Sequence, residues 1–302
     1  MCSGISVTNF VVDVQKLKGV ILMSPSIPAR EDRKIITDAE NEAEALLSEP
    51  GQAKGLRSDP DWVSHIPDGL WLKPEEMAAS EARIIWQALD LAPGREVLDC
   101  PCGDGRVGIH LARRGIRYTG LDINPRFIRR AGERFAAEGL EGALLLRDMR
   151  ELDYEGRFEA VVNWFNSFGY YDVETDFLVL QRLAMALRPG GRLIIEAPNP
   201  VEVAADTEQK LDIEGIEVVK QWDEPSRRVL YILNRLEENG RTVRVVSGVR
   251  LYSLSEYRRL FLLAGLELEQ VYDELLGEYT ERSRRMILLG RKPRHPDIAE
   301  SG

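Results

Sequence analysis

The chain has 302 residues, 44% of them hydrophobic, which is enough for one large α/β core with appendages. Its 50 acidic and 40 basic side chains give a formal net charge of −10, so the average surface repels double-stranded nucleic acid. Three cysteines, an odd number, do not suit a disulfide framework and favour a reducing compartment, the cytosol. No run of about 18 apolar residues occurs, and charges interrupt residues 11–23, so we expect neither a membrane span nor a signal peptide.

Composition divides the chain into an N-terminal extension, residues 1–66, and a main domain, residues 67–302. The extension is expected to be partly helical or disordered, with a helix over 30–47. The stretch from 49 to 68 is rich in Pro, Gly, Ser and Asp, which is typical of a linker or a lid. If that lid folded over a site, His65 could act there as a base.

A helix is predicted from Pro74 to Leu91, at the start of the main domain. Proline suits the first turn of a helix, and Glu75 and Glu76 favour the positive end of its dipole. Trp71 precedes this helix. It is a candidate to cover a bound cofactor, and packing in the core is an equal alternative.

The most informative stretch is 96–106, where a short apolar strand ends in an acid and a glycine-bearing turn then opens a helix. Glycines in such a turn permit positive φ and let the backbone approach a ligand, and the first turn of the helix offers unpaired N–H groups. We therefore expect a nucleotide-cofactor loop. Its candidate binding residues are Asp99, Cys100, Pro101, Gly103 and Gly105.

Two cofactors compete for this loop. Gly103, Gly105 and Gly108 form G-x-G-x-x-G, and Asp122 follows Gly103 by 19 residues, as a dinucleotide fold requires. Asp99, however, would stand beside the pyrophosphate of NAD, and like charges a few ångströms apart repel strongly. S-adenosylmethionine carries an ammonium and a sulfonium instead of a phosphate, so Asp99 favours S-adenosylmethionine.

The next two strands also end in acids. Residues 116–122 form a strand that ends at Asp122, which could accept both ribose hydroxyls and is followed by Ile123. Residues 143–149 end with Asp148 and Met149, which could bind the adenine amino group and pack on the ring. Ligands of open α/β sheets lie beyond the carboxyl ends of the strands, so we expect the three acids to converge on one crevice.

With these motifs, residues 67 to 292 resemble the class I S-adenosylmethionine-dependent methyltransferases of the small-molecule type. Val97 to Arg106 matches the family's cofactor motif, with Pro101 where the family usually has glycine. The resemblance implies a Rossmann-like, doubly wound, seven-stranded α/β sheet. It also implies an antiparallel last strand, for which residues 285–291 are the candidate, and S-adenosylmethionine as the cofactor.

The stretch from Phe158 to Tyr170 resembles the family's fourth strand and the loop after it, and Asn163 joins the cofactor-binding candidates. An Asn-Pro-Pro-Tyr signature is absent, which weighs against methylation of an adenine or glutamine amino group. Tyr170 and Tyr171, with Asp172, are the candidates for general base, because the acceptor should approach this loop. Packing or positioning is the alternative role for both tyrosines.

After the fifth strand, residues 214–251 are predicted to form a small antiparallel β insertion of three strands, with a hairpin turn at 237–240. This insertion would cap the substrate side and could also form a homodimer. A helix follows from Ser253 to Ala264, with Ser253 and Glu256 as a capping box. Further on, Tyr279, Arg282 and Arg284 are candidates to bind an anionic acceptor, and a solvated charged surface is the alternative.

The sequence thus predicts a methyltransferase that uses S-adenosylmethionine to methylate a nitrogen or oxygen atom of a small-molecule acceptor. We expect no metal, because Cys100 and Cys102 supply only half of a zinc site, and no nucleic acid or membrane partner. Two alternatives remain open at this point. One is an NAD-dependent oxidoreductase and the other a non-catalytic cofactor-binding module.

Overall fold

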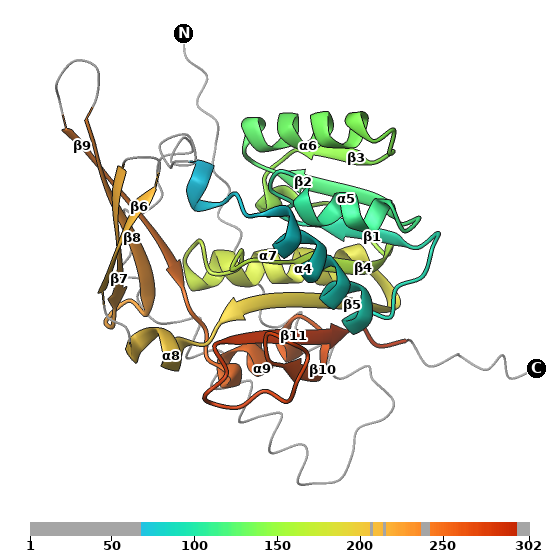
Figure 1. The fold of residues 1–302 in the computed structure, drawn as a ribbon. Helices are drawn as coiled ribbons and strands as arrows, with labels where there is room; N and C mark the ends of the chain where they lie inside the picture. The colour runs from blue at the N-terminus through green and yellow to red at the C-terminus, as the bar shows by residue number, and fades with distance from the viewer. Residues whose placement is uncertain (1–67, 206–207, 214–215, 237–241, 295–302) are drawn as a thin grey trace, which may run out of the picture.

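A seven-stranded sheet forms the centre of the protein in the computed structural model, which describes residues 68–205, 208–213, 216–236 and 242–294 (Figure 1). The strand order is β10-β11-β5-β4-β1-β2-β3. The five strands from β1 to β5 pair in parallel, and β11 pairs antiparallel with β5 and with β10. The predicted sheet with its antiparallel last strand is confirmed. The strands are β1 (Glu96–Asp99), β2 (Arg117–Asp122), β3 (Ala143–Leu146), β4 (Phe158–Asn163), β5 (Leu187–Pro198), β10 (Glu267–Tyr272) and β11 (Arg285–Arg291).

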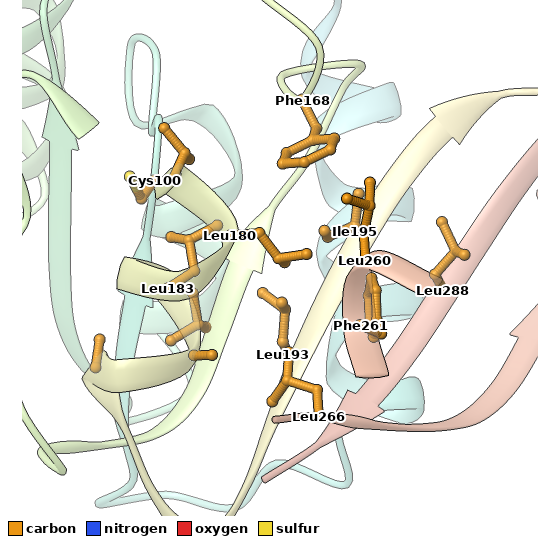
Figure 2. Close-up of a cluster of buried hydrophobic side chains, with 14 of the residues drawn as sticks. Cys100, Phe168, Leu180, Leu183, Leu193, Ile195, Leu260, Phe261, Leu266 and Leu288 are labelled. Atoms are coloured by element: carbon orange, nitrogen blue, oxygen red, sulfur yellow. The ribbon is translucent and has the colours of Figure 1, made fainter. Parts of the chain in front are cut away.

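Helices cover both faces of this sheet because successive strand residues point to opposite faces. Leu98 and Leu193 lie in the core beneath α7 and α9, whose leucines and phenylalanines fill that side (Figure 2). Val97 and Ile194, their neighbours along the chain, lie in the core beneath α4 and α5. The sheet is therefore doubly wound. The helices are α4 (Glu75–Ala88), α5 (Arg106–Ala112), α6 (Pro125–Ala137), α7 (Val173–Ala186), α8 (Pro200–Ala205) and α9 (Leu254–Leu263), with 3-10 turns η1 (Asp68–Leu70) and η2 (Met149–Glu151).

The ends of two helices test the sequence patterns directly. The helix α9 begins after Ser253, whose side chain accepts from the Glu256 N–H while Glu256 accepts from the Ser253 N–H, so the capping box is confirmed. The helix α4 begins at Glu75, one residue after the predicted start at Pro74, and ends at Ala88, three residues before the expected Leu91. Within the described residues, no helix is long and apolar enough to cross a bilayer.

A second, four-stranded antiparallel sheet follows β5, with the order β6-β7-β8-β9. It stands beyond the end of β5, past α8 (Figure 1). The three strands expected within 214–251 correspond to β7, β8 and β9, and the structure adds β6 as an edge strand that the sequence analysis missed. We call this unit the β insertion. Its strands are β6 (Glu208–Ile213), β7 (Ile216–Asp223), β8 (Arg228–Leu236) and β9 (Thr242–Arg250).

Several predictions concern residues outside the described part of the chain. They are the N-terminal extension 1–66 with its helix over 30–47, the linker before residue 68, His65, and the hairpin turn at 237–240. The division of the chain into an extension and a main domain stays a prediction.

The third glycine of the G-x-G-x-x-G pattern generates a stability prediction. Gly108 lies in α5, where an added Cβ would stand 2.2 Å from the Tyr118 ring of β2. Gly132 lies in α6 with nothing within 4 Å of the same position. We expect Gly108→Ala to lower the free energy of unfolding by about 1–3 kcal/mol through overpacking. Gly132→Ala should raise it by about 0.5–1 kcal/mol, because alanine favours a helix.

Urea unfolding of the two variants and the wild type measures both effects. Gly132→Ala controls for the change in helix propensity, since it makes the same substitution in an uncrowded helix. A Gly108→Ala variant as stable as Gly132→Ala would show that α5 does not pack as closely on Tyr118 as described.

Candidate functional site

The three predicted acids come together at the carboxyl edge of the sheet, although β3 ends at Leu146, before Asp148. Asp99 and Asp122 are the last residues of their strands, and Asp148 caps η2 just after β3. All three line one pocket, which we call the edge pocket. The other predicted site residues that line it are Trp71, Pro101, Gly103, Ile123, Met149, Tyr170 and Tyr171.

Asp99 is buried with a single neutral donor at its carboxylate. It is 3% exposed, and the Tyr118 hydroxyl donates to its Oδ2 at 2.8 Å. Burial raises the pKa of Asp99 to about 7; the Tyr118 hydrogen bond opposes this rise and the nearby charge of Asp122 adds to it. Asp99 is therefore poised to ionise when a cation is bound beside it.

Asp122 ties the cofactor loop to the end of β2. The Gly103 N–H donates to its Oδ2 at 2.9 Å, and the Asn124 N–H donates to its Oδ1 at 2.8 Å. Burial raises the pKa of Asp122 to about 6, although these backbone donors favour the ionised form. Gly103 has a φ of +55°, which a glycine adopts at little cost. The loop conformation and the position of this carboxylate thus depend on each other.

Three of the predicted cofactor-binding residues lie behind the loop instead of lining the pocket. Asn163 is fully buried at the end of β4, where its Nδ2 donates to the Cys100 carbonyl at 2.8 Å. Gly105 caps α5 with a φ of +73° and faces Ala131 of α6. The thiol of Cys100 is buried, which raises its pKa well above the usual range. We infer that Cys100, Gly105 and Asn163 shape the loop.

The uncompensated charge of the edge pocket is negative. Both guanidiniums that line it are paired with carboxylates outside it, Arg106 with Glu81 and Arg147 with Asp153. Asp104 and Asp148 are paired with arginines, whereas Asp99 and Asp122 receive only neutral donors. A pyrophosphate would meet two unpaired carboxylates here. An ammonium or sulfonium would be attracted, and an adenosine could use the acids as acceptors.

No group of three or more His, Cys, Asp or Glu side chains in the described residues is arranged to hold a metal ion. Cys100 and Cys102 are both free and buried.

The sequence analysis missed an aromatic segment of the pocket. Trp164, Phe165 and Ser167 follow β4 and line the edge pocket. Phe165 and Asn166 have φ values of +62° and +54°, an uncommon conformation for residues other than glycine. The aromatic run after a buried strand was the signal available for these residues.

A second hollow, of about 780 Å³, adjoins the edge pocket. It lies between the end of β5, α8, the β insertion and the loop from β10 to β11. Trp71 and Phe165 line both spaces, so the two are neighbours across these rings. We call it the insertion hollow. Its size suits a small organic molecule rather than a single ion.

The loop that carries Tyr170 is clamped by the β insertion. Arg228 of β8 donates to the carbonyls of Gly169, at 3.2 Å, and Tyr171, which flank Tyr170. The Tyr171 N–H donates to buried Asp176 of α7 at 3.0 Å. The β insertion therefore sets the position of the two tyrosines, which the sequence could not show.

Other candidate residues have separate roles. Asp172 accepts from the Thr175 N–H and caps α7, so it does not line the edge pocket. Of the three residues considered for an anionic acceptor, Arg284 lines the insertion hollow, whereas Tyr279 and Arg282 do not.

Sequence comparison finds similarity to known methyltransferases. A family model described as a methyltransferase domain matches residues 97–191, which contain all three acids. YqeM of Bacillus subtilis is 27% identical over 145 residues, 47% of this chain and 53% of YqeM. The cypemycin N-terminal methyltransferase of a Streptomyces species is 28% identical over 209 residues, 65% of this chain and 82% of that protein. The chain thus spans about half the length of the first relative and most of the second.

A solved structure shows the same fold. It is an S-adenosylmethionine-dependent methyltransferase from Clostridium acetobutylicum, which superposes with a TM-score of 0.62 over 76% of this chain and 98% of its own. The sequences are 16% identical.

The hydrogen bond between Tyr118 and Asp99 generates a prediction for the site. Tyr118→Phe removes the donor that stabilises the ionised carboxylate, so the pKa of Asp99 should rise above about 7. Carbon-detected NMR titration of the labelled aspartate carboxyl groups measures this shift. Tyr154→Phe is the control, because that ring packs on Phe158. An Asp99 pKa that stays the same in Tyr118→Phe would exclude the hydrogen bond in solution.

Proposed function

We propose that the chain, which belongs to the class I S-adenosylmethionine-dependent methyltransferases, methylates a nitrogen or oxygen atom of a small molecule bound in the insertion hollow. The observation that carries the proposal is the meeting of Asp99, Asp122 and Asp148 in a pocket that shares Trp71 and Phe165 with that hollow.

The edge pocket fits S-adenosylmethionine by its charge and its lining. Asp99 would hold the ammonium, Asp122 the ribose hydroxyls and Asp148 the adenine amino group, with Met149 and Ile123 against the ring. When bound, S-adenosylmethionine supplies an electrophilic methyl group on a sulfonium. The unpaired carboxylates weigh against NAD, and Gly108 of the dinucleotide pattern is explained by the packing of α5 on Tyr118.

The chain's own contribution is orientation and the exclusion of water. Trp71 and Phe165 line both spaces, and Tyr170 lines the edge pocket. Their rings would align the acceptor and keep solvent away. We propose Tyr170 and Tyr171 as the residues that contact the acceptor atom. Either hydroxyl oxygen could accept a hydrogen bond from an N–H or O–H group of the acceptor.

A nitrogen acceptor is favoured by one relative, the cypemycin N-terminal methyltransferase, whose similarity covers 65% of this chain. The absence of an Asn-Pro-Pro-Tyr signature after β4 supports an acceptor other than the amino group of adenine or glutamine. A homodimer through the β insertion and a cytosolic location stay predictions.

Isothermal titration with S-adenosylmethionine, S-adenosylhomocysteine and NAD tests the cofactor assignment. We expect both sulfur compounds to bind and NAD to show no binding. In Asp122→Ala, S-adenosylhomocysteine should bind about 1.5–3 kcal/mol more weakly, the range for losing a charged hydrogen-bond partner. The 2′-deoxy analogue of S-adenosylhomocysteine should bind the wild type more weakly than S-adenosylhomocysteine does. Asp122→Ala should bind the two compounds with similar affinity. Binding of NAD alone would reverse the assignment, and equal losses of the analogue in both proteins would refute the ribose role.

The raised pKa values of Asp99 and Asp122 make cofactor binding pH-dependent. Below pH 7 a growing fraction of Asp99 is protonated, and below 6 the same holds for Asp122, so a cofactor that needs both carboxylates ionised must displace these protons. We expect the affinity for S-adenosylmethionine to fall about tenfold from pH 7.5 to pH 6, with protons released on binding. Titration in buffers of different ionisation enthalpy measures the release.

Asp99→Asn separates the contributions of Asp99 and Asp122 to this pH dependence. It should bind S-adenosylmethionine more weakly at pH 7.5 and retain only the smaller pH dependence that comes from Asp122. A wild-type affinity that is flat over this range, without proton release, would contradict the role of Asp99.

A further inference from the structure

The β insertion presents a row of side chains to the insertion hollow. Gln209 of β6 pairs directly with Lys220 of β7, which pairs directly with Tyr231 of β8. Directly paired residues of antiparallel strands point to the same face, with Cβ atoms about 5 Å apart. All three side chains line the hollow, so its wall here is one polar row across the sheet.

This row leads toward the edge pocket. The Tyr231 ring lies with its centroid 6.5 Å from that of Trp71, which lines both spaces. Lys220 is therefore one cross-strand step beyond the ring that meets Trp71. A small molecule that reached from Trp71 along Tyr231 would place its far end at Lys220.

Lys220 is a cation on an otherwise uncharged face. Among the residues of this face whose side chains are described, its neighbours Val218, Val229, Leu233 and Val249 are buried and apolar. The ammonium contacts the Gln209 Oε1 at 3.4 Å, a long contact to a neutral group. No carboxylate of the described residues lies within ion-pair distance of it. A half-buried ammonium with one neutral partner keeps donors free for an anion.

The other charges of the hollow come from different walls. Lys73, before α4, donates to the Leu70 carbonyl at 3.1 Å and lies over the Phe165 ring. Arg285 of β11 forms an ion pair with the buried carboxylate of Glu196, and Arg284 is exposed at the rim. Glu202 and Glu274 belong to α8 and to the loop after β10. Lys220 is therefore the cation that the described residues of the β insertion contribute to the hollow, whereas Lys73, Arg284 and both carboxylates belong to other walls. An anionic group bound at Lys220 would lie on the β insertion, away from these carboxylates.

We propose that Lys220 binds an anionic group, a carboxylate or a phosphate, of the acceptor, while the acceptor's reactive nitrogen or oxygen faces Trp71. The inference rests on the proposed function, because it takes the insertion hollow as the acceptor site. It assigns the acceptor to the class of small amphipathic anions, whose apolar body packs on Tyr231, Leu211 and Val229.

Ligand-observed NMR of the protein saturated with S-adenosylhomocysteine tests the proposal with three probes of similar size: benzoate, phenyl phosphate and benzamide. At least one anionic probe should bind the wild type about tenfold more tightly than neutral benzamide, as expected for a hydrogen bond to a charged group. Whichever anion binds more tightly identifies the carboxylate or the phosphate as the preferred group.

Lys220→Met should remove this preference, and Lys220→Gln should do the same with a polar side chain of similar length. Lys210→Met is the matched control, since Lys210 lies on β6 between Gln209 and Leu211, is exposed, and does not line the hollow. It should keep the preference. A wild type that binds the anions no more tightly than benzamide overturns the proposal, as does a Lys220 variant that retains the preference.

Titration with S-adenosylhomocysteine separates this proposal from the proposed function. Unchanged affinity in the Lys220 variants shows that their edge pocket is folded. A wild type that binds S-adenosylhomocysteine but shows no anion preference rejects only the role of Lys220, whereas a wild type that does not bind S-adenosylhomocysteine rejects the proposed function itself.

Discussion

Burying Asp99 and Asp122 at the ends of adjacent parallel strands costs free energy, since each carboxylate loses water and lies close to the other. The surrounding structure offsets this cost with neutral donors. Tyr118 donates to Asp99, and the Gly103 and Asn124 N–H groups donate to Asp122. Because one of these donors belongs to the loop after β1, the loop is shaped by the acid at the end of β2. The hydrogen bonds that hold the folded loop in place therefore also shape the edge pocket.

The same dependence extends to the packing behind the pocket. Tyr118 reaches Asp99 by lying against α5, and only glycine at position 108 leaves room for its ring. A side chain there would push the helix and the hydroxyl apart. The glycines of the G-x-G-x-x-G pattern therefore have different roles in this chain. Gly103 permits the turn, and Gly108 permits close contact of helix and strand.

A second network connects the acceptor side to the core. Asp176 is buried beneath the loop of Tyr170, where it accepts from the Tyr171 N–H and from the Tyr252 hydroxyl at 2.8 Å. Arg228 holds the same loop from the β insertion. Asp176 lies in α7, Arg228 in β8 and Tyr252 between β9 and α9, so a shift of the β insertion would move the tyrosines relative to the edge pocket. The insertion is therefore part of the site and not only a cover.

How far the sequence predicts this structure depends on the range of each interaction. The capping box of Ser253 and Glu256, the turn at Gly103 and the strands that end in acids are set within a few residues, and all were predicted. The convergence of the acids followed from the geometry of parallel strands. Arg228 and Tyr171 are 57 residues apart, and their contact depends on how the two sheets meet. The strand β6 was missed because it pairs only at an edge, through a segment with two apolar residues, Leu211 and Ile213, among six.

The charges on the walls of the two spaces restrict how an acceptor can bind. The unpaired carboxylates of the edge pocket attract the cationic end of the cofactor and repel an anionic group of the acceptor. Lys220, across the junction at Trp71, attracts that group. In the proposed binding mode, the anionic end of the acceptor therefore lies on the β insertion and its uncharged or basic end faces the edge pocket. The overall charge of −10 hides this arrangement, because orientation depends on where the few unpaired charges lie.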